Sequence, residues 1–181
     1  MRAPTIAAIV FAAAVTPAAA WTHTRPLTPG AAALIADAAD RSSIIESLLQ
    51  ALERTDVVVY VSDQDNRSAS MPQACLRWLS AAGGLRYVLV QIAPWQTMPL
   101  ERIAWLGHEL QHALEIAQAP DVRDADGVAR LYRRIGWEEG HNHFESDAAR
   151  RIGDLVRDEL AGFTLPFELI TSPEGPRPVR D

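Results

Sequence analysis

Residues 99–118 read PLERIAWLGHELQHALEIAQ, a stretch whose start and periodicity both predict an α-helix. Thr97 offers a capping hydroxyl, Pro99 suits a first helical turn, and Glu101 lies near the positive end of the helix dipole. We expect this helix to run from Thr97 to about Gln118.

The predicted helix has two chemically different faces. At about 100° per residue, His108, His112 and Glu115 fall on one side. The other side is apolar and is formed by Ile103, Leu106, Leu110, Ala113, Leu114 and Ala117. The face expected to enter the core is therefore separate from the face that carries chemistry.

That chemistry is an H-E-x-x-H motif, His108-Glu109-Leu110-Gln111-His112. Two histidines one turn apart can both place a ring nitrogen about 2.0–2.1 Å from one zinc ion. Glu109 lies beside them and can accept a proton from water that the metal activates. The alternative is a chance combination on a solvated helix face. We predict a Zn²⁺ site with His108 and His112 as ligands and Glu109 as catalytic base.

A catalytic zinc site needs a third protein ligand. Glu145, in the segment HFESDAAR, is the first candidate because it begins what reads as a later helix that could descend beside the first. Because the start of that helix is uncertain by a residue or two, neighbouring side chains stay open as alternatives. These are His141, His143, Glu138 and Glu139.

Two acidic residues are candidates for orienting a ligand histidine. Glu115 lies on the correct face, but a straight helix places it about 10 Å from His108 along the axis, which suits a supporting role better than ligation. Asp147 could play the same role or be a solvated acid in a first helical turn.

Other polar and aromatic residues could belong to the site, although ordinary surface or packing roles are favoured for all of them. The candidate donors to a developing oxyanion are His143, Tyr132 and Arg133, and the candidate walls of a cleft are Trp95, Trp105 and Trp137.

Elsewhere the patterns predict an α+β protein, with a small two- or three-stranded sheet packed on the active-site helix and about three further helices. Strands are expected where β-branched residues concentrate, at VVVYVS (57–62) and YVLVQIAP (87–94), with residues 76–79 as a candidate third strand. Helices are expected at 32–54, long or broken with Ser42 or Ser43 as a second cap, at 128–135 and at 144–161, with a polar loop at 121–127.

The ends of the chain read differently from its middle. Residues 1–20, MRAPTIAAIVFAAAVTPAAA, have the basic start, short apolar run and small-residue ending of a signal peptide, with cleavage expected after Ala20. An irregular leader (21–31), one domain (32–165) and a proline-rich tail (166–181) follow. We therefore expect a periplasmic or secreted protein with no stable membrane insertion after cleavage.

The charge and the cysteine content of the chain also bear on its expected partners and on its stability. The formal net charge is −6 and there is no basic block, so nucleic acid is not an expected partner. Cys75 is the single cysteine, which leaves no intrachain disulfide and favours a buried structural thiol. A peptide or protein substrate is the expected partner.

With these motifs in view, the chain resembles the zincin superfamily, and within it the gluzincin branch, in which H-E-x-x-H is followed by a glutamate on a later helix. Here HELQH is followed by Glu145, and the strings HELQHALEIA and FESDAAR are similar to those of small exported bacterial proteins regarded as metalloproteases. The resemblance covers about residues 56–160. It implies zinc held by His108, His112 and Glu145, and peptide hydrolysis with Glu109 as base.

Two positions depart from the patterns of that superfamily. Glu115 stands where the metzincin extension has glycine, and Ala149 stands where gluzincins usually have aspartate, four residues after the glutamate. The leading expectation is a zinc metallopeptidase. The alternatives are a zincin-like domain that binds zinc in a structural or partner-binding role, and a zinc hydrolase of non-peptide amides or esters.

Overall fold

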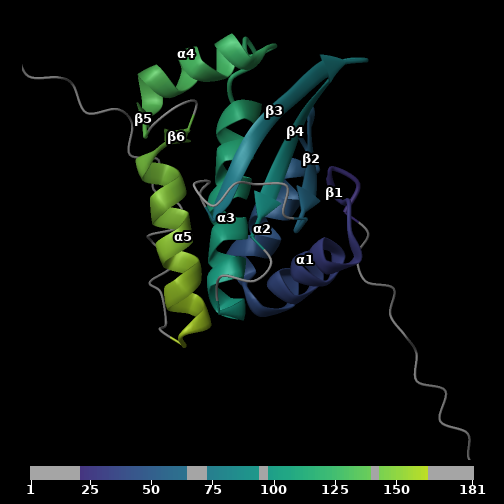
Figure 1. Ribbon diagram of the computed structural model, residues 1–181, viewed down its shortest axis with the longest axis vertical. Helices are drawn as coiled ribbons and strands as arrows, with labels where there is room; N and C mark the ends of the chain where they lie inside the picture. The colour runs from purple at the N-terminus through teal and green to yellow at the C-terminus, as the bar shows by residue number, and fades with distance from the viewer. Residues whose placement is uncertain (1–20, 65–72, 94–97, 140–142, 163–181) are drawn as a thin grey trace, which may run out of the picture.

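The computed structural model describes residues 21–64, 73–93, 98–139 and 143–162, and in these ranges the protein is α+β. A small mixed sheet lies against helices, and one helix runs between the sheet and the last helix (Figure 1). In chain order the elements are β1 (Thr24–Pro26), α1 (Pro29–Arg41), α2 (Ser43–Leu52), β2 (Val57–Ser62), β3 (Ala74–Ala82), β4 (Leu85–Ile92), α3 (Pro99–Ala117), α4 (Ala125–Ile135), β5 (Trp137–Glu138), β6 (Phe144–Glu145) and α5 (Asp147–Leu160).

The main sheet has the strand order β1-β2-β4-β3. Its first three strands are mutually parallel, and β3 pairs antiparallel with β4. Gly83 and Gly84 close that hairpin with φ angles of 60° and 81°, which glycine adopts without strain. The strand β2 is central, and its valine-rich sequence is almost wholly buried, as expected of a strand that is covered on both faces.

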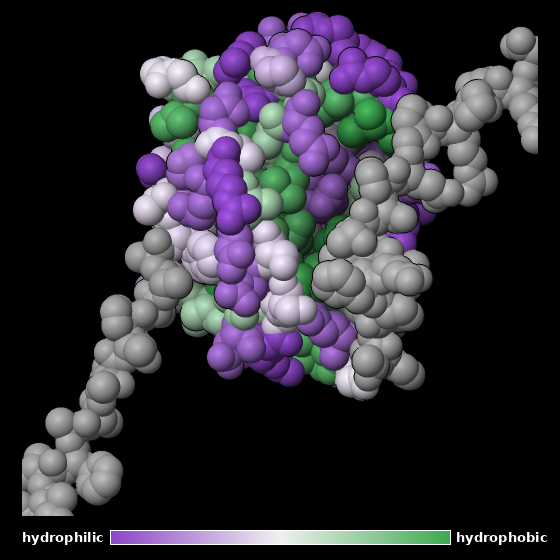
Figure 2. Space-filling model, turned by 180° about the vertical axis from the view of Figure 1, so that it is seen from behind, coloured by the Kyte–Doolittle hydropathy of each residue, from purple (hydrophilic) through white to green (hydrophobic). Residues whose placement is uncertain are grey.

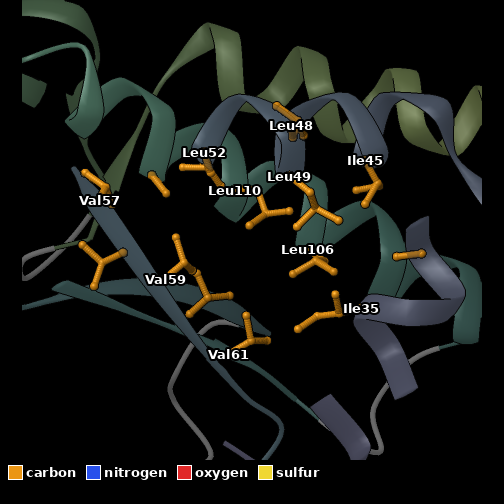
Figure 3. Close-up of a cluster of buried hydrophobic side chains, with 14 of the residues drawn as sticks. Ile35, Ile45, Leu48, Leu49, Leu52, Val57, Val59, Val61, Leu106 and Leu110 are labelled. Carbon is orange, nitrogen blue, oxygen red and sulfur yellow. The ribbon is translucent and has the colours of Figure 1, made fainter. Parts of the chain in front are cut away.

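The hydrophobic core lies between the sheet and the helices. The β2 valines Val57, Val59 and Val61 face Leu49 of α2 and Leu106 of α3, and these side chains meet in one cluster (Figure 3). Burying each such side chain contributes about 1.5–3 kcal/mol to stability. The apolar face of the helix that carries HELQH is therefore what fixes it to the sheet.

The C-terminal end of α3 is anchored by a buried arginine on β4. Arg86 is 1% exposed and pairs with Asp56 through two hydrogen bonds, of 2.5 and 3.0 Å. The same guanidinium donates to the carbonyl oxygens of Ile116, Ala117 and Ala119 at 2.6–3.0 Å. These carbonyls lie at or just after the C-terminus of α3, where the last backbone carbonyls of a helix cannot be paired by N–H groups of the same helix. Arg86 thus holds α3 in a defined position against the sheet.

On its other side α3 packs closely against α2 and α5. A Cβ atom on Gly107 would lie 3.0 Å from Ile45 and 3.1 Å from Val156, so the absence of a side chain lets the three helices approach.

Seen from behind, hydrophilic side chains crowd the end where α4 lies, and hydrophobic ones show in a strip near the middle (Figure 2). Within the described ranges no helix has the length and apolar character needed to cross a bilayer.

Several predicted elements agree with the structure. The helix expected at 32–54 is broken at Ser42, whose hydroxyl accepts a hydrogen bond from the Ile45 N–H at 3.2 Å and caps the second half. The strand expected at 57–62 is β2, and the strand expected at 87–94 is β4, which begins two residues earlier and ends at Ile92. Cys75 is a buried thiol, as expected. The proposed signal peptide and the tail from residue 166 lie outside the described residues, as do Trp95 and Thr97.

Other predictions were wrong in their boundaries or in the number of strands. The leader expected to be irregular contains β1, because backbone pairing with β2 stabilises it despite its composition. The candidate strand at 76–79 extends over 74–82. With β1 as an unexpected addition, the sheet has four strands rather than two or three. The helix α4 begins at Ala125, inside the expected polar loop, because Asp124 caps it through the Gly127 N–H.

The prediction of a helix from Phe144 was also wrong. Phe144 and Glu145 form strand β6, which pairs with β5, and α5 starts only at Asp147, after the capping residue Ser146. Glu145 therefore sits on a short strand at the entrance to the helix.

Candidate metal centre

Two structural elements bring the three candidate ligands together. The helix α3 carries His108 and His112 one turn apart, as its sequence predicts. Glu145 comes from β6, where it pairs with Trp137 of β5 immediately before the N-terminus of α5. Because α5 packs along α3, the side chain of Glu145 lies over the two imidazole rings.

The donor atoms of these residues converge. The Nε2 atoms of His108 and His112 lie 3.5 and 3.6 Å from the same carboxylate oxygen, Oε1 of Glu145. One ligand atom from each residue lies within 4.8 Å of the others, and among the described residues this is the group of that kind that could hold a metal ion. The two rings meet edge to face, with centroids 4.8 Å apart.

This geometry fits a small divalent ion better than it fits hydrogen bonds. Distances of 3.5 and 3.6 Å are too long for hydrogen bonds between these atoms. Two donors each held about 2.0–2.1 Å from a tetrahedral ion are about 3.4 Å apart, close to the separations found here. In addition, the buried Nε2 of His112 has no hydrogen-bond partner among the described residues, whereas buried polar atoms usually have one. The group His108, His112 and Glu145 could hold a metal ion.

The orientation of Glu145 is fixed from several directions. Its Oε1 atom accepts a hydrogen bond from the Ser146 N–H at 2.8 Å, while Oε2 lies 3.3 Å from Nε of Arg150. Arg150 is held in turn by Glu139 at 3.0 Å and lies over the ring of Trp137, 4.7 Å from its centroid. One carboxylate oxygen therefore faces the histidines and the other faces a cation.

Behind the rings, His112 meets a second carboxylate. Its Nδ1 atom lies 2.8 Å from Oε2 of Glu115 and 2.9 Å from the hydroxyl of Tyr132. Tyr132 is 2% exposed and its ring stacks on Phe144. The role that the sequence suggested for Glu115, orienting a ligand histidine, is the one its contacts support, whereas Tyr132 packs behind the site.

Glu109 borders a cavity of about 360 Å³ together with two of the candidate ligands, His108 and Glu145. Trp105, His108 and Glu109 of α3 form one wall, and Arg150 and Arg157 of α5 form another, with Gln73 before β3 at the rim. Glu109 is 4% exposed. A buried carboxylate thus lies next to the histidines in a cavity that is open enough to admit a ligand.

Burial and neighbouring charges shift the pKa values of these groups. Burial, assisted by His112, lowers the pKa of His108 to about 4, and burial raises the pKa of Glu109 to about 7. Burial opposes the charged forms of Glu145 and His112, but their contacts outweigh it: the histidines lower the pKa of Glu145 to about 2, and Glu115 and Glu145 raise that of His112 to about 9. A metal ion bound here would displace a proton from His112.

The remaining candidates from the sequence lie elsewhere. Glu138 and Glu139 are exposed on or beside β5, and neither belongs to the ligand group. His143 lines the cavity without joining that group, and His141 lies outside the described residues. Asp147 is exposed in the first turn of α5, which supports its reading as a solvated acid.

Of the other aromatic and cationic candidates, Trp105 borders the cavity and Trp137 packs under Arg150. Arg133 is exposed on α4 and does not line the cavity.

Sequence reasoning missed part of the site. Arg150, Asp154 and Arg157 line the cavity from α5, and their spacing of four and three residues places them on one face of that helix. With Glu145 as the predicted ligand, this spacing on the helix that follows it could have identified the three residues. Ser146 was missed as well, although serine before a run of helix formers is a common N-cap.

Comparison with protein-family models, with curated protein sequences and with solved structures found no match for this chain.

Proposed function

We propose that this protein is an exported zinc-dependent peptidase, in which His108, His112 and Glu145 hold the metal and Glu109 is the general base. The observation that carries the proposal is the convergence of two imidazole nitrogens and a carboxylate oxygen at the spacing of tetrahedral ligands. A helix with HELQH against a mixed sheet, followed by a glutamate before a later helix, supports a zincin-like assignment. The signal peptide that the sequence predicts in residues 1–20 supports a periplasmic or secreted location.

The donor set favours zinc among the common metals, because imidazole and carboxylate ligands in a three-residue group are typical of catalytic zinc sites. A zinc ion bound there would supply a Lewis acid that polarises a carbonyl group and acidifies water. Structural zinc sites usually use four protein ligands, so three ligands beside a cavity support catalysis rather than a purely structural role.

Side chains of the protein supply the base, the orientation of Glu145 and the hydrogen-bond donors to a substrate. Glu109 borders the cavity beside the histidines, where its carboxylate can take a proton from the attacking water and deliver it to the leaving amine. Arg150 holds Glu145 in its orientation through Oε2. His143 and Arg157 supply donors in the cavity wall for the carbonyl groups of a substrate. A volume of about 360 Å³ suits a short segment of an extended peptide.

Replacement of Glu109 tests the proposal most directly. Glu109→Gln keeps the size of the side chain and removes the base, so it should retain zinc and lose about 10²–10⁴-fold in peptide hydrolysis. Glu46→Gln is the matched control, because it makes the same substitution at an exposed position on α2. His112→Ala should lose zinc. The measurements are zinc stoichiometry by elemental analysis and cleavage of a peptide library.

Two results would overturn the proposal. Wild-type protein that folds but takes up no zinc would remove the metal site, and a Glu109→Gln variant as active as the wild type would remove the assigned base. Hydrolysis of esters or cell-wall amides that depends on Glu109, without cleavage of any peptide, would replace the peptide substrate while keeping the hydrolase.

A further inference from the structure

Glu115 is a buried carboxylate that holds two different segments of the site. It is 6% exposed, and both of its oxygens are engaged. Oε2 lies 2.8 Å from Nδ1 of His112, and Oε1 accepts a hydrogen bond from the hydroxyl of Ser146 at 2.5 Å. A buried acid with two such partners is fixed in place, and its position fixes theirs.

The contact with His112 determines which ring nitrogen is available to a metal. A carboxylate offers only acceptor lone pairs, so a hydrogen bond at 2.8 Å requires the proton to be on Nδ1 of His112. In the neutral ring, Nε2 then presents its lone pair. That atom is buried, has no hydrogen-bond partner within the described part of the chain, and lies 3.6 Å from Oε1 of Glu145. Glu115 therefore selects the tautomer and ring orientation that point a free lone pair at the candidate metal position.

The contact with Ser146 acts on the third ligand. Ser146 follows Glu145 directly, and its Oγ also accepts the Ala149 N–H at 3.1 Å as the N-cap of α5. Ala149 is fully buried and has no side-chain acceptor. The acceptor for the Ser146 hydroxyl is instead Glu115 of α3. Glu115 thus connects His112, on its own helix, to Ser146, which directly follows the candidate ligand Glu145 on β6.

We propose that Glu115 is a positioning residue for the metal, holding His112 directly and Glu145 through Ser146. The inference rests on the proposed metal site, because it assigns a role in metal binding and none in contact with substrate. Tyr132 supports the arrangement by covering the same edge of the His112 ring, with its hydroxyl 2.9 Å from Nδ1.

The test compares zinc affinity by competition with a chelator. Glu115→Gln preserves side-chain volume but can donate as well as accept, so affinity should fall about 10–100-fold, the usual effect of losing the partner of a ligand histidine. Asp147→Asn is the matched control, since it also replaces a carboxylate by an amide, but at an exposed position in the first turn of α5. Its zinc affinity should equal that of the wild type.

A second pair of variants separates positioning from simple destabilisation. Ser146→Ala removes the donor to Glu115 and should weaken zinc binding about tenfold. Ser42→Ala is its control, because Ser42 also caps a helix, accepting from the Ile45 N–H at 3.2 Å and donating to Glu159 at 2.5 Å, far from the ligands. Both variants lose a cap worth about 1 kcal/mol, but only the first should change affinity.

A spectroscopic measurement reads the hydrogen bond itself. In the proton NMR spectrum of the zinc-loaded wild type and of Asp147→Asn, the Nδ1 proton of His112 should resonate at low field and exchange slowly with solvent. In Glu115→Gln it should move upfield and exchange faster. If that variant does not fold, the Ser146→Ala and Ser42→Ala pair decides.

Equal zinc affinity in Glu115→Gln and Asp147→Asn, or in the two serine variants, would overturn the role of Glu115 while leaving the metal site intact. A wild type that takes up no zinc would overturn the role of Glu115 together with the proposed function. Zinc binding that depends on Glu115, without any hydrolysis that depends on Glu109, would support this inference and refute the peptidase.

Discussion

Replacement of Gly136 by alanine should disturb the candidate metal centre from outside it. Gly136 ends α4, where its N–H donates to the Tyr132 carbonyl at 2.8 Å, and it precedes β5, the strand that pairs with β6. A Cβ atom at Gly136 would lie 1.9 Å from the carbonyl oxygen of Glu145. The absence of a side chain at Gly136 therefore allows the backbone of Glu145 to lie where it does.

The magnitude follows from the size of the clash. Real Cβ atoms essentially never approach a backbone atom within 3.0 Å, so the Glu145 carbonyl or Gly136 itself must move by at least about 1.1 Å. Metal sites tolerate displacements of about 0.2 Å in ligand distance. Gly136→Ala should therefore lower zinc affinity about a hundredfold, and overpacking should lower the free energy of unfolding by about 1–3 kcal/mol.

The assay is chelator competition for zinc, with urea unfolding of the metal-free protein measured alongside. Gly153→Ala is the control, because α5 brings Gly153 against α3 at a comfortable distance. A Cβ atom there would lie 3.6 Å from His108 Cβ and 3.7 Å from the Ala104 carbonyl oxygen, which is ordinary contact. This variant should bind zinc like the wild type and be more stable by up to about 1 kcal/mol, the helix preference of alanine over glycine.

Wild-type zinc affinity in Gly136→Ala, in a folded protein, would refute the reasoning, because it would mean that pairing of β5 with β6 does not set the position of Glu145. Loss of zinc in both glycine variants would point instead to a general sensitivity of the packing between α3 and α5.

Two further predictions concern stability. Leu110 is fully buried on the apolar face of α3, so Leu110→Ala should lower the free energy of unfolding by about 2–5 kcal/mol in urea while the folded protein keeps its zinc affinity; loss of affinity would show that the two faces of α3 are coupled. The hydrogen bonds from Arg86 hold the pKa of Asp56 below its ordinary value of 3.8. Above pH 3.8 the wild type should therefore be more stable to urea than Asp56→Asn, and it should lose this advantage as the pH falls through the lower pKa of Asp56 in the folded protein. A difference in urea midpoint that persists unchanged in strong acid would contradict the assignment.

The helix that carries HELQH was predictable because its signals are local. Pro99 and Glu101 mark its start, and apolar residues recur at helical spacing along one face through Leu110. In the structure α3 runs from Pro99 to Ala117, with that face in the core. Its C-terminal anchor was not predictable, since Arg86 reaches the end of α3 from a strand thirty residues earlier in the chain.

Glu145 lies close to both histidines, as predicted, but the local structure predicted for it was wrong. The composition of the segment FESDAAR favours a helix, yet Phe144 and Glu145 pair with Glu138 and Trp137 as strands. Such pairing depends on Gly136 leaving room for the Glu145 backbone and on a partner strand outside the segment itself, which helix propensity does not record. The start of α5 was nevertheless encoded locally, because Ser146 with Asp147 after it is a capping sequence.

The supporting contacts of His112 show where the limit of sequence reasoning lies. Spacing alone brings Glu115 beside His112, since residues three apart share a helix face, and the structure places their side chains 2.8 Å apart. Nothing local brings in Ser146, because its contact depends on α5 packing along α3. Without that second contact Glu115 could rotate away from the histidine, whereas with it both carboxylate oxygens are held. The helical spacing therefore places the Glu115 carboxylate beside His112, and the packing of α5 against α3 fixes its orientation through Ser146.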